Sequence, residues 1–310
     1  MFKNFVSFLL TLWVAVNVVE IGSAAKILSI SFVSSKSHFI VYKPLLHALA
    51  DRGHEVTIAS PIGPDKERKN VKHYQLYNPD DHASTTLPNM FELKEQTSSS
   101  IYTYIANPFW QFMPMFAAGC KKGYESPILE QIKKEKYDLI IFTPLFNDCL
   151  YGLIHQLNTT TVLLSQVVIV PWVAESFGAP TLPSFTPLLF YGFTDEMDFW
   201  ERVINFLGII YYQATLKLYY NPFAEKIYRH YVNPNAPSVK EIEKNASLIL
   251  VNSHINFIPP RPLMADIIEV GGMHMQPPKT LPKVFIVIMK QISTFSSFLT
   301  SWTALGCCRI

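Results

Sequence analysis

Residues 25–61, AKILSISFVSSKSHFIVYKPLLHALADRGHEVTIASP, contain the pattern that decides the fold. A short apolar run rich in β-forming residues lies at residues 26–32, and a second lies at residues 54–60. Between them, the apolar residues of segment 40–49 approximate the spacing of one helix face. A strand, a helix and a strand within about 35 residues form one βαβ unit, so we predict a parallel pair with a right-handed crossover.

The rest of the chain continues this alternation of strands and helices. Residues 61–100 are polar and are predicted to form a long loop with little order. Strands are predicted at residues 137–143, 160–166, 248–252 and 267–271, and helices at residues 101–134, from about residue 147, and at residues 199–231. This order predicts an α/β fold, a Rossmann-like doubly wound parallel sheet that forms one domain over residues 26–283.

Composition sets limits on the class of protein. The chain is 49% hydrophobic and 16% charged, so it can bury a full core and is not a disordered chain. Its net charge is +2 with dispersed cations, which argues against nucleic acid as a partner. Aromatic residues are concentrated between residues 101 and 232, where they suit either a thick helical core or a pocket for apolar ligands.

The N-terminus indicates the secretory pathway. Lys3, an apolar run and a cluster of small residues predict a signal peptide at residues 1–25, with a retained membrane anchor as the alternative. Asn158 and Asn245 lie in N-glycosylation sequons. The four cysteines show no metal-binding spacing, and we interpret Cys120 and Cys149 as small buried apolar residues rather than as a disulfide. We expect localisation to the endoplasmic reticulum.

The loop after the first strand is the most informative place for chemistry. It contains no glycine, so it is not built for a dinucleotide. Ser37 is placed to cap the following helix, and Gly53 to end it in a left-handed cap. His38 stands in the first turn, where the helix dipole favours a neutral imidazole that can act as a general base. The alternative is a histidine that makes only local hydrogen bonds.

A carboxylate behind a histidine base would fix its tautomer and stabilise its charged form. Asp148 follows the strand at residues 137–143, which we expect to neighbour the first strand. An acidic residue in a first helical turn is also a good partner for the helix dipole, and this alternative stays open.

Four segments resemble insect and other animal UDP-glucuronosyl- and UDP-glucosyltransferases. They are residues 25–61, FNDCLYGL at 146–153, YGFTDEMDFWER at 191–202 and the segment 248–283. The resemblance implies the N-terminal, acceptor-binding domain of a GT-B glycosyltransferase, in which the histidine of a Ser-His motif deprotonates the acceptor. Ser37-His38 matches that motif, so His38 takes the role of base. Thr143 stands where the family usually has its acid, and Asp148 resembles the acid of the insect NDC segment.

The resemblance also implies substrates. A UDP-sugar would be the co-substrate, with no permanent cofactor and no metal, and the acceptor would be a small lipophilic phenol, steroid or plant toxin. We expect acceptor-binding side chains beside His38 and in two aromatic stretches that look like binding loops, at residues 101–116 and 170–191. The predicted residues are Ser37, Phe39, Phe109, Phe112 and Trp172.

The resemblance ends at residue 283. Residues 284–310 resemble nothing in the family and stand where a donor-binding domain and a membrane anchor are expected. Autonomous transfer is therefore not expected from the sequence as written, because the donor-binding domain would supply the main electrostatic stabilisation. The alternatives are a noncatalytic luminal partner of full-length relatives, or an incomplete gene product.

Overall fold

The computed structural model describes residues 24–64, 66–78, 101–188, 191–254, 256, 258 and 261–275, with the backbone alone over 101–111. All but two residues of the predicted signal peptide, and the whole of the predicted tail at 284–310, lie outside this described part. The chain divides into two units, Met1–His274 and Met275–Ile310, and every element named below belongs to the first.

Seven parallel strands form one sheet in the order β3-β2-β1-β4-β5-β6-β7. Strand order reverses between β1 and β4, which pair in parallel as the sequence predicts. The doubly wound, Rossmann-like fold class is therefore confirmed. The strands are β1 (Lys26–Ile30), β2 (Glu55–Ser60), β3 (Val71–Gln75), β4 (Leu139–Phe142), β5 (Thr161–Ser165), β6 (Leu248–Val251) and β7 (Ile267–Glu269).

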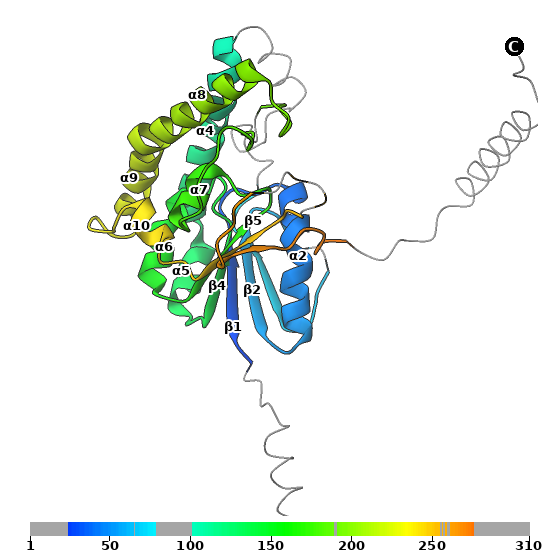
Figure 1. The fold of residues 1–310 in the computed structure, drawn as a ribbon. Coiled ribbons are helices and arrows are strands. Elements are labelled where there is room, and N and C mark those ends of the chain that lie inside the picture. The colour runs from blue at the N-terminus through cyan, green and yellow to red at the C-terminus, as the bar shows by residue number, and fades with distance from the viewer. Residues whose placement is uncertain are drawn as a thin grey trace, which may run out of the picture. The chain divides into compact units, whose positions relative to one another are not determined.

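Helices cover both faces of this sheet (Figure 1). The α-helices are α2 (Lys36–Asp51), α4 (Ile101–Glu125), α5 (Pro127–Lys134), α6 (Tyr151–Leu157), α7 (Pro171–Ser176), α8 (Phe199–Thr215), α9 (Asn221–Tyr231) and α10 (Val239–Glu243). A 3-10 turn, η3 (Asp148–Leu150), precedes α6, and a π-helical turn, η4 (Leu216–Tyr220), joins α8 to α9.

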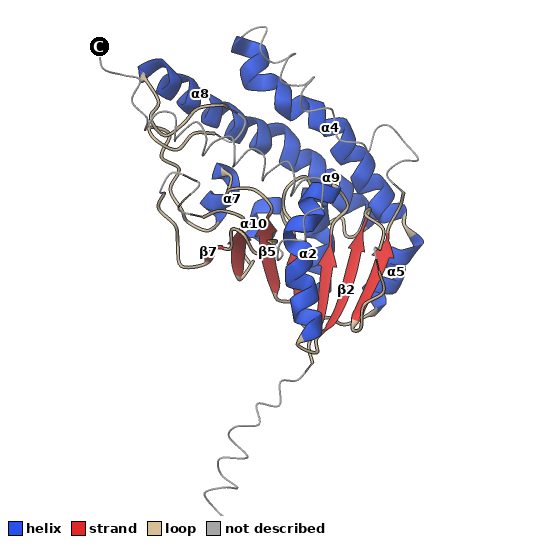
Figure 2. Cartoon of the chain, turned by 90° about the vertical axis from the view of Figure 1, so that its right-hand side faces the viewer, coloured by secondary structure: helices blue, strands red, loops and turns tan. Residues whose placement is uncertain are grey.

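Alternation along the strands divides the core between the two faces. Ile27 of β1 packs under α2 with Phe39 and Tyr42, whereas Leu28 and Ile30 point into the larger core on the other face. That larger core also contains buried aromatic side chains of α4, α6 and α9. In Figures 1 and 2, α4 and α8 extend beyond the edge of the sheet at which the strands end.

Two predictions about local structure need correction. Residues 71–75, expected to lie in a loop, form β3, which pairs with β2 over five residues. The segment is polar because β3 is an edge strand with partly exposed side chains, so it lacks the apolar run that reveals a buried strand. The N-cap of α2 is Ser35 and not Ser37: the Ser35 hydroxyl accepts from the backbone N–H of His38 at 3.2 Å. Gly53, at φ 97°, takes the left-handed conformation predicted for it.

Candidate active site

The β1–α2 loop places His38 in the first turn of α2. Its side chain is half-buried, and burial lowers the pKa of the imidazole. The ring is therefore mainly neutral at pH 7. Within the described part of the chain, no hydrogen bond is formed by either ring nitrogen. His38 is thus in the protonation state in which it can accept a proton.

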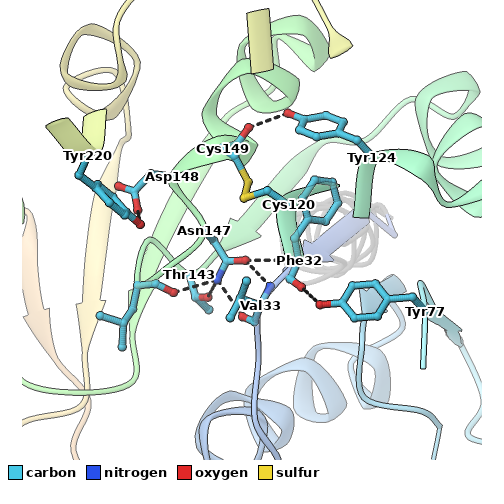
Figure 3. The surroundings of a disulfide bond; sticks show 11 residues. Phe32, Val33, Tyr77, Cys120, Tyr124, Thr143, Asn147, Asp148, Cys149 and Tyr220 are labelled. Carbon is cyan, nitrogen blue, oxygen red and sulfur yellow. Dashed lines mark hydrogen bonds between the residues drawn. A yellow bond between two sulfur atoms is a disulfide. The ribbon is translucent and has the colours of Figure 1, made fainter. Parts of the chain in front are cut away.

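Asn147 fixes the β1–α2 loop to the end of β4, a role that the sequence did not reveal. Its side chain is fully buried, and its Oδ1 accepts from the backbone N–H groups of Phe32 at 2.7 Å and Val33 at 2.8 Å. Its Nδ2 donates to the carbonyl oxygens of Val33 and Leu145, each at 2.9 Å. Figure 3 shows this amide between the two loops. Asn147 therefore holds in register the two loops that meet where strand order reverses.

The Asp148 side chain points away from the Asn147 amide and towards Tyr220 of η4 (Figure 3). The Tyr220 hydroxyl donates to Asp148 Oδ2 at 2.6 Å. Burial is the main cause that raises the pKa of the Asp148 carboxyl, to about 7. Among the described residues, no hydrogen bond or ion pair joins Asp148 to His38. The structure therefore brings Asp148 together with Tyr220, and a His38–Asp148 pair stays a prediction.

Cys120 and Cys149 form a disulfide, so their interpretation as unpaired buried residues was wrong. The Cα atoms are 6.2 Å apart, and both side chains are fully buried. The fold brings the two cysteines together because α4 passes directly beside η3. This tertiary contact cannot be inferred from the spacing of the cysteines in the sequence. The hydroxyl of Tyr124, also in α4, donates to the Cys149 carbonyl oxygen at 2.6 Å. Together these contacts attach α4 to the turn that carries Asp148.

A small, mainly apolar cavity lies at the carboxyl ends of β4 and β5; a water-sized sphere can move through about 40 Å³ of it, and the surrounding empty space of about 590 Å³ includes open solvent. Phe112 and Trp172, both predicted to bind the acceptor, line it together with Asp148. The Phe112 ring packs on Phe146 at 4.9 Å, and Val33 of the β1–α2 loop packs against the cluster of Phe112 and Met115. The other lining residues are Pro144, Leu145, Phe146, Ser165, Val167, Val170, Val173, Leu216 and Tyr220.

Two other predicted acceptor-binding residues, Phe39 and Ser37, are not among the described residues that line the cavity. Phe39 is a residue of α2 that points into the core between this helix and the sheet, with its ring 5.2 Å from that of Tyr42. Ser37 is exposed, with its hydroxyl 2.8 Å from that of Ser35. The Phe109 side chain lies outside the described residues. Of the five predicted residues, the structure thus places Phe112 and Trp172 in the cavity.

An ionic cluster around the buried carboxylate of Glu243 fixes α7, and with it Trp172, against α10. Glu243 is 2% exposed and accepts from the hydroxyls of Tyr151, at 2.8 Å, and Ser176. Lys240 Nζ lies 2.8 Å from Glu243 Oε2 and also donates to Ser176 Oγ and to the Trp172 carbonyl oxygen. Sequence reasoning missed this cluster because its members come from α6, α7 and α10.

The remaining predictions concern modification, membrane and metal. Asn158 and Asn245 are both exposed, and Asn158 takes the left-handed conformation that ends α6. No helix among the described residues has the length and apolarity to cross a bilayer. In the same part of the chain, no group of three or more His, Cys, Asp and Glu could hold a metal ion.

Comparison with known proteins assigns the chain to a family. Residues 25–293 match the model of "UDP-glucoronosyl and UDP-glucosyl transferase". UDP-glucosyltransferase 2 of Dactylopius coccus is 27% identical over 84% of this chain and 50% of its own length. Human UDP-glucuronosyltransferase 3A1 is 28% identical over 86% and 51%.

The chain spans about half the length of the curated relatives it matches. A solved structure titled as the glycotransferase of kitacinnamycin aligns with 84% of this chain and 56% of its own, at 12% identity and a TM-score of 0.44. Because the family model covers most of the chain, the chain belongs to the family of UDP-glucuronosyl and UDP-glucosyl transferases.

Proposed function

We propose that this chain forms the acceptor-binding half of a UDP-dependent glycosyltransferase and holds a small lipophilic acceptor for attack on a UDP-sugar. The observation that carries the proposal is the apolar cavity at the carboxyl edge of the sheet, beside the loop that presents His38. Ligands of open α/β sheets bind at this edge, where strand order reverses. Family membership supports the UDP-sugar donor.

In the proposed reaction, the neutral His38 imidazole accepts the proton of an acceptor hydroxyl. The oxygen then forms a bond to the anomeric carbon of the sugar as the bond to UDP breaks, and the anomeric configuration inverts. Proton transfer to a positioned base contributes roughly 10² to 10⁴ in rate. The negative charge that develops on UDP needs stabilisation by the donor-binding half of the enzyme.

Several features support the finer parts of the proposal. The aromatic lining of the cavity suits phenols, steroids and plant toxins as a class. The Cys120–Cys149 bond and the exposed sequon residues Asn158 and Asn245 support folding in the oxidising secretory pathway, in the lumen or at the membrane of the endoplasmic reticulum. A noncatalytic role beside full-length relatives is the second candidate, favoured because His38 is not among the described residues that line the cavity.

Binding of 1-naphthol to the full chain tests the proposal. We expect calorimetry to detect heat of binding and fluorescence to report quenching, because Trp172 lines the cavity. In Trp172→Phe the heat of binding should remain while most of the quenching disappears. The absence of binding heat from folded protein, or quenching that survives unchanged in Trp172→Phe, would place the acceptor elsewhere and refute this assignment.

A further inference from the structure

Among the described residues that line the cavity, Asp148 is the only charged one. The residue is partly exposed and lines the cavity, and burial among protein atoms is the main cause that raises the pKa of its carboxyl. The other polar lining groups are Ser165, whose hydroxyl donates to the Val167 carbonyl oxygen at 2.9 Å, and Tyr220, which donates to Asp148 itself. A single carboxyl in an otherwise apolar wall decides which polar group of a ligand can be accommodated there.

The charges around Asp148 do not balance. Glu243 and Lys240 form an ion pair, and Asp148 adds a further negative charge when it is ionised. A lysine ammonium has three N–H donors, and those of Lys240 go to Glu243, Ser176 and the Trp172 carbonyl oxygen. In the described part of the chain, no cationic side chain lies within 4.0 Å of the Asp148 carboxyl. The site is therefore one positive charge short.

We propose that Asp148 determines acceptor specificity: together with Tyr220, it selects acceptors that carry a protonated amine at the end remote from the reacting hydroxyl. The inference rests on the proposed function, because it takes this cavity to be the acceptor site. The ammonium supplies the missing positive charge and donates to the carboxylate, while the apolar part of the ligand contacts Phe112 and Trp172.

The selection depends on pH, because an ammonium binds to the ionised carboxyl. Four titratable or charged side chains act on the Asp148 carboxyl. They are Tyr220 of η4, Tyr151 of α6, and Glu243 and Lys240 of α10. Burial and the charge of Glu243 raise the pKa of Asp148, whereas the Tyr220 hydrogen bond and Lys240 lower it, giving a value of about 7. Preference for an amine should therefore rise as the pH increases from 5.5 to 8.

The test compares two phenols of nearly equal shape. At the end of the side chain, tyramine carries an ammonium group where 4-propylphenol carries a methyl group. Calorimetry with the full chain at pH 8 gives the ratio of their dissociation constants. We expect Asp148→Asn to reduce the relative affinity for tyramine roughly tenfold or more, since a hydrogen bond to a charged group is lost. The affinity for 4-propylphenol should change by less than about threefold, because its contacts are apolar.

Tyr220→Phe provides a second, independent readout. Loss of its hydroxyl removes a hydrogen bond that lowers the Asp148 pKa, so the midpoint of the pH profile for tyramine should move upward. Asp51→Asn is the matched control: this exposed carboxylate pairs with Arg68 on the surface, and its removal should leave the ratio and the profile unchanged. Thermal unfolding of each variant checks that it is folded.

The outcomes separate this inference from the proposed function. If neither phenol binds, the cavity is not the acceptor site and both proposals fail. If both bind but Asp148→Asn leaves their ratio unchanged, the specificity role is refuted while the acceptor site stands. Equal weakening of both phenols would assign Asp148 a structural role and would also overturn the inference.

Discussion

Asn147 shows at the scale of one residue how two loops are held in register. Its amide makes hydrogen bonds both to the loop that precedes His38 and to the turn that precedes Asp148. Because the side chain is fully buried, its loss would leave backbone donors and acceptors without partners.

We predict that Asn147→Ala lowers the free energy of unfolding by about 2–4 kcal/mol, as several buried hydrogen bonds are lost. Urea denaturation followed by circular dichroism measures the change. Asn235→Ala, at an exposed loop position, is the control and should change stability by less than about 0.5 kcal/mol. A similar small change for Asn147→Ala would show that the amide does not support the loops.

The Asp148 carboxyl makes stability depend on pH. Its ordinary pKa of 3.8 is raised to about 7 in the fold, so the folded protein binds this proton more tightly than the unfolded chain does. The free energy of unfolding therefore falls as pH rises between about 4 and 7. We expect Asp148→Asn to remove this dependence. The variant's free energy of unfolding, measured relative to that of wild type, should therefore be higher at pH 8 than at pH 4 by on the order of 2–4 kcal/mol. Parallel pH profiles for wild type and variant in urea denaturation would contradict this.

Single residues were predictable where their chemistry is expressed locally. The position of His38 in a first helical turn was predictable because the loop before it and the helix after it are both visible in one segment, and the position of Trp172 at the cavity because its stretch has the composition of a binding loop. The role of Asn147 and the burial of Phe39 depend on contacts between distant segments. Periodicity in one segment contains no information on such contacts.

At the scale of elements, the Cys120–Cys149 bond ties α4 to the start of α6. The cysteines are 29 residues apart, and closing a loop of that length stabilises the fold by roughly 3–4 kcal/mol in the chain-entropy description. We predict that the double variant Cys120→Ser with Cys149→Ser loses about that much stability. Cys307→Ser with Cys308→Ser is the control. Equal stability of the two double variants would argue against the disulfide.

Close packing of α4 on the first loop depends on a glycine. A Cβ at Gly123 would lie 2.3 Å from the Phe32 ring, which is itself fully buried. We expect Gly123→Ala to lower stability by about 1–2 kcal/mol, because overpacking exceeds the gain in helix propensity. Gly192→Ala adds a Cβ in open space and should be neutral. Thermal unfolding compares the two, and an unchanged or raised melting temperature for Gly123→Ala would contradict the packing.

Elements were predictable in proportion to their burial. The buried strands β1, β4 and β5 are apolar runs and were identified, whereas the partly exposed edge strand β3 has no such signature. The helical tract at 199–231 was predicted as continuous, yet η4 widens it at residues 216–220. That turn presents Leu216 and Tyr220 to the cavity, and helical periodicity alone does not show where a π-turn occurs.

For the molecule as a whole, strand order determines where chemistry can take place. The order of the sheet places its switch point between β1 and β4, and the cavity opens beside it. Alternation of strands and helices was enough to predict the edge at which this cavity lies. The shape of the cavity was not predictable, because α4, α7 and η4 reach it from separate parts of the chain.

The most direct test of the account is sugar transfer that depends on His38. Residues 26–283 of this chain, joined to the C-terminal half of the Dactylopius coccus relative, would be assayed with a UDP-sugar and 1-naphthol. We predict transfer by the wild-type chimera, a loss of kcat of roughly a hundredfold or more in His38→Gln with naphthol affinity unchanged, and little effect of His54→Gln. Retention of kcat within a few-fold in His38→Gln would contradict the assignment of His38 as the base.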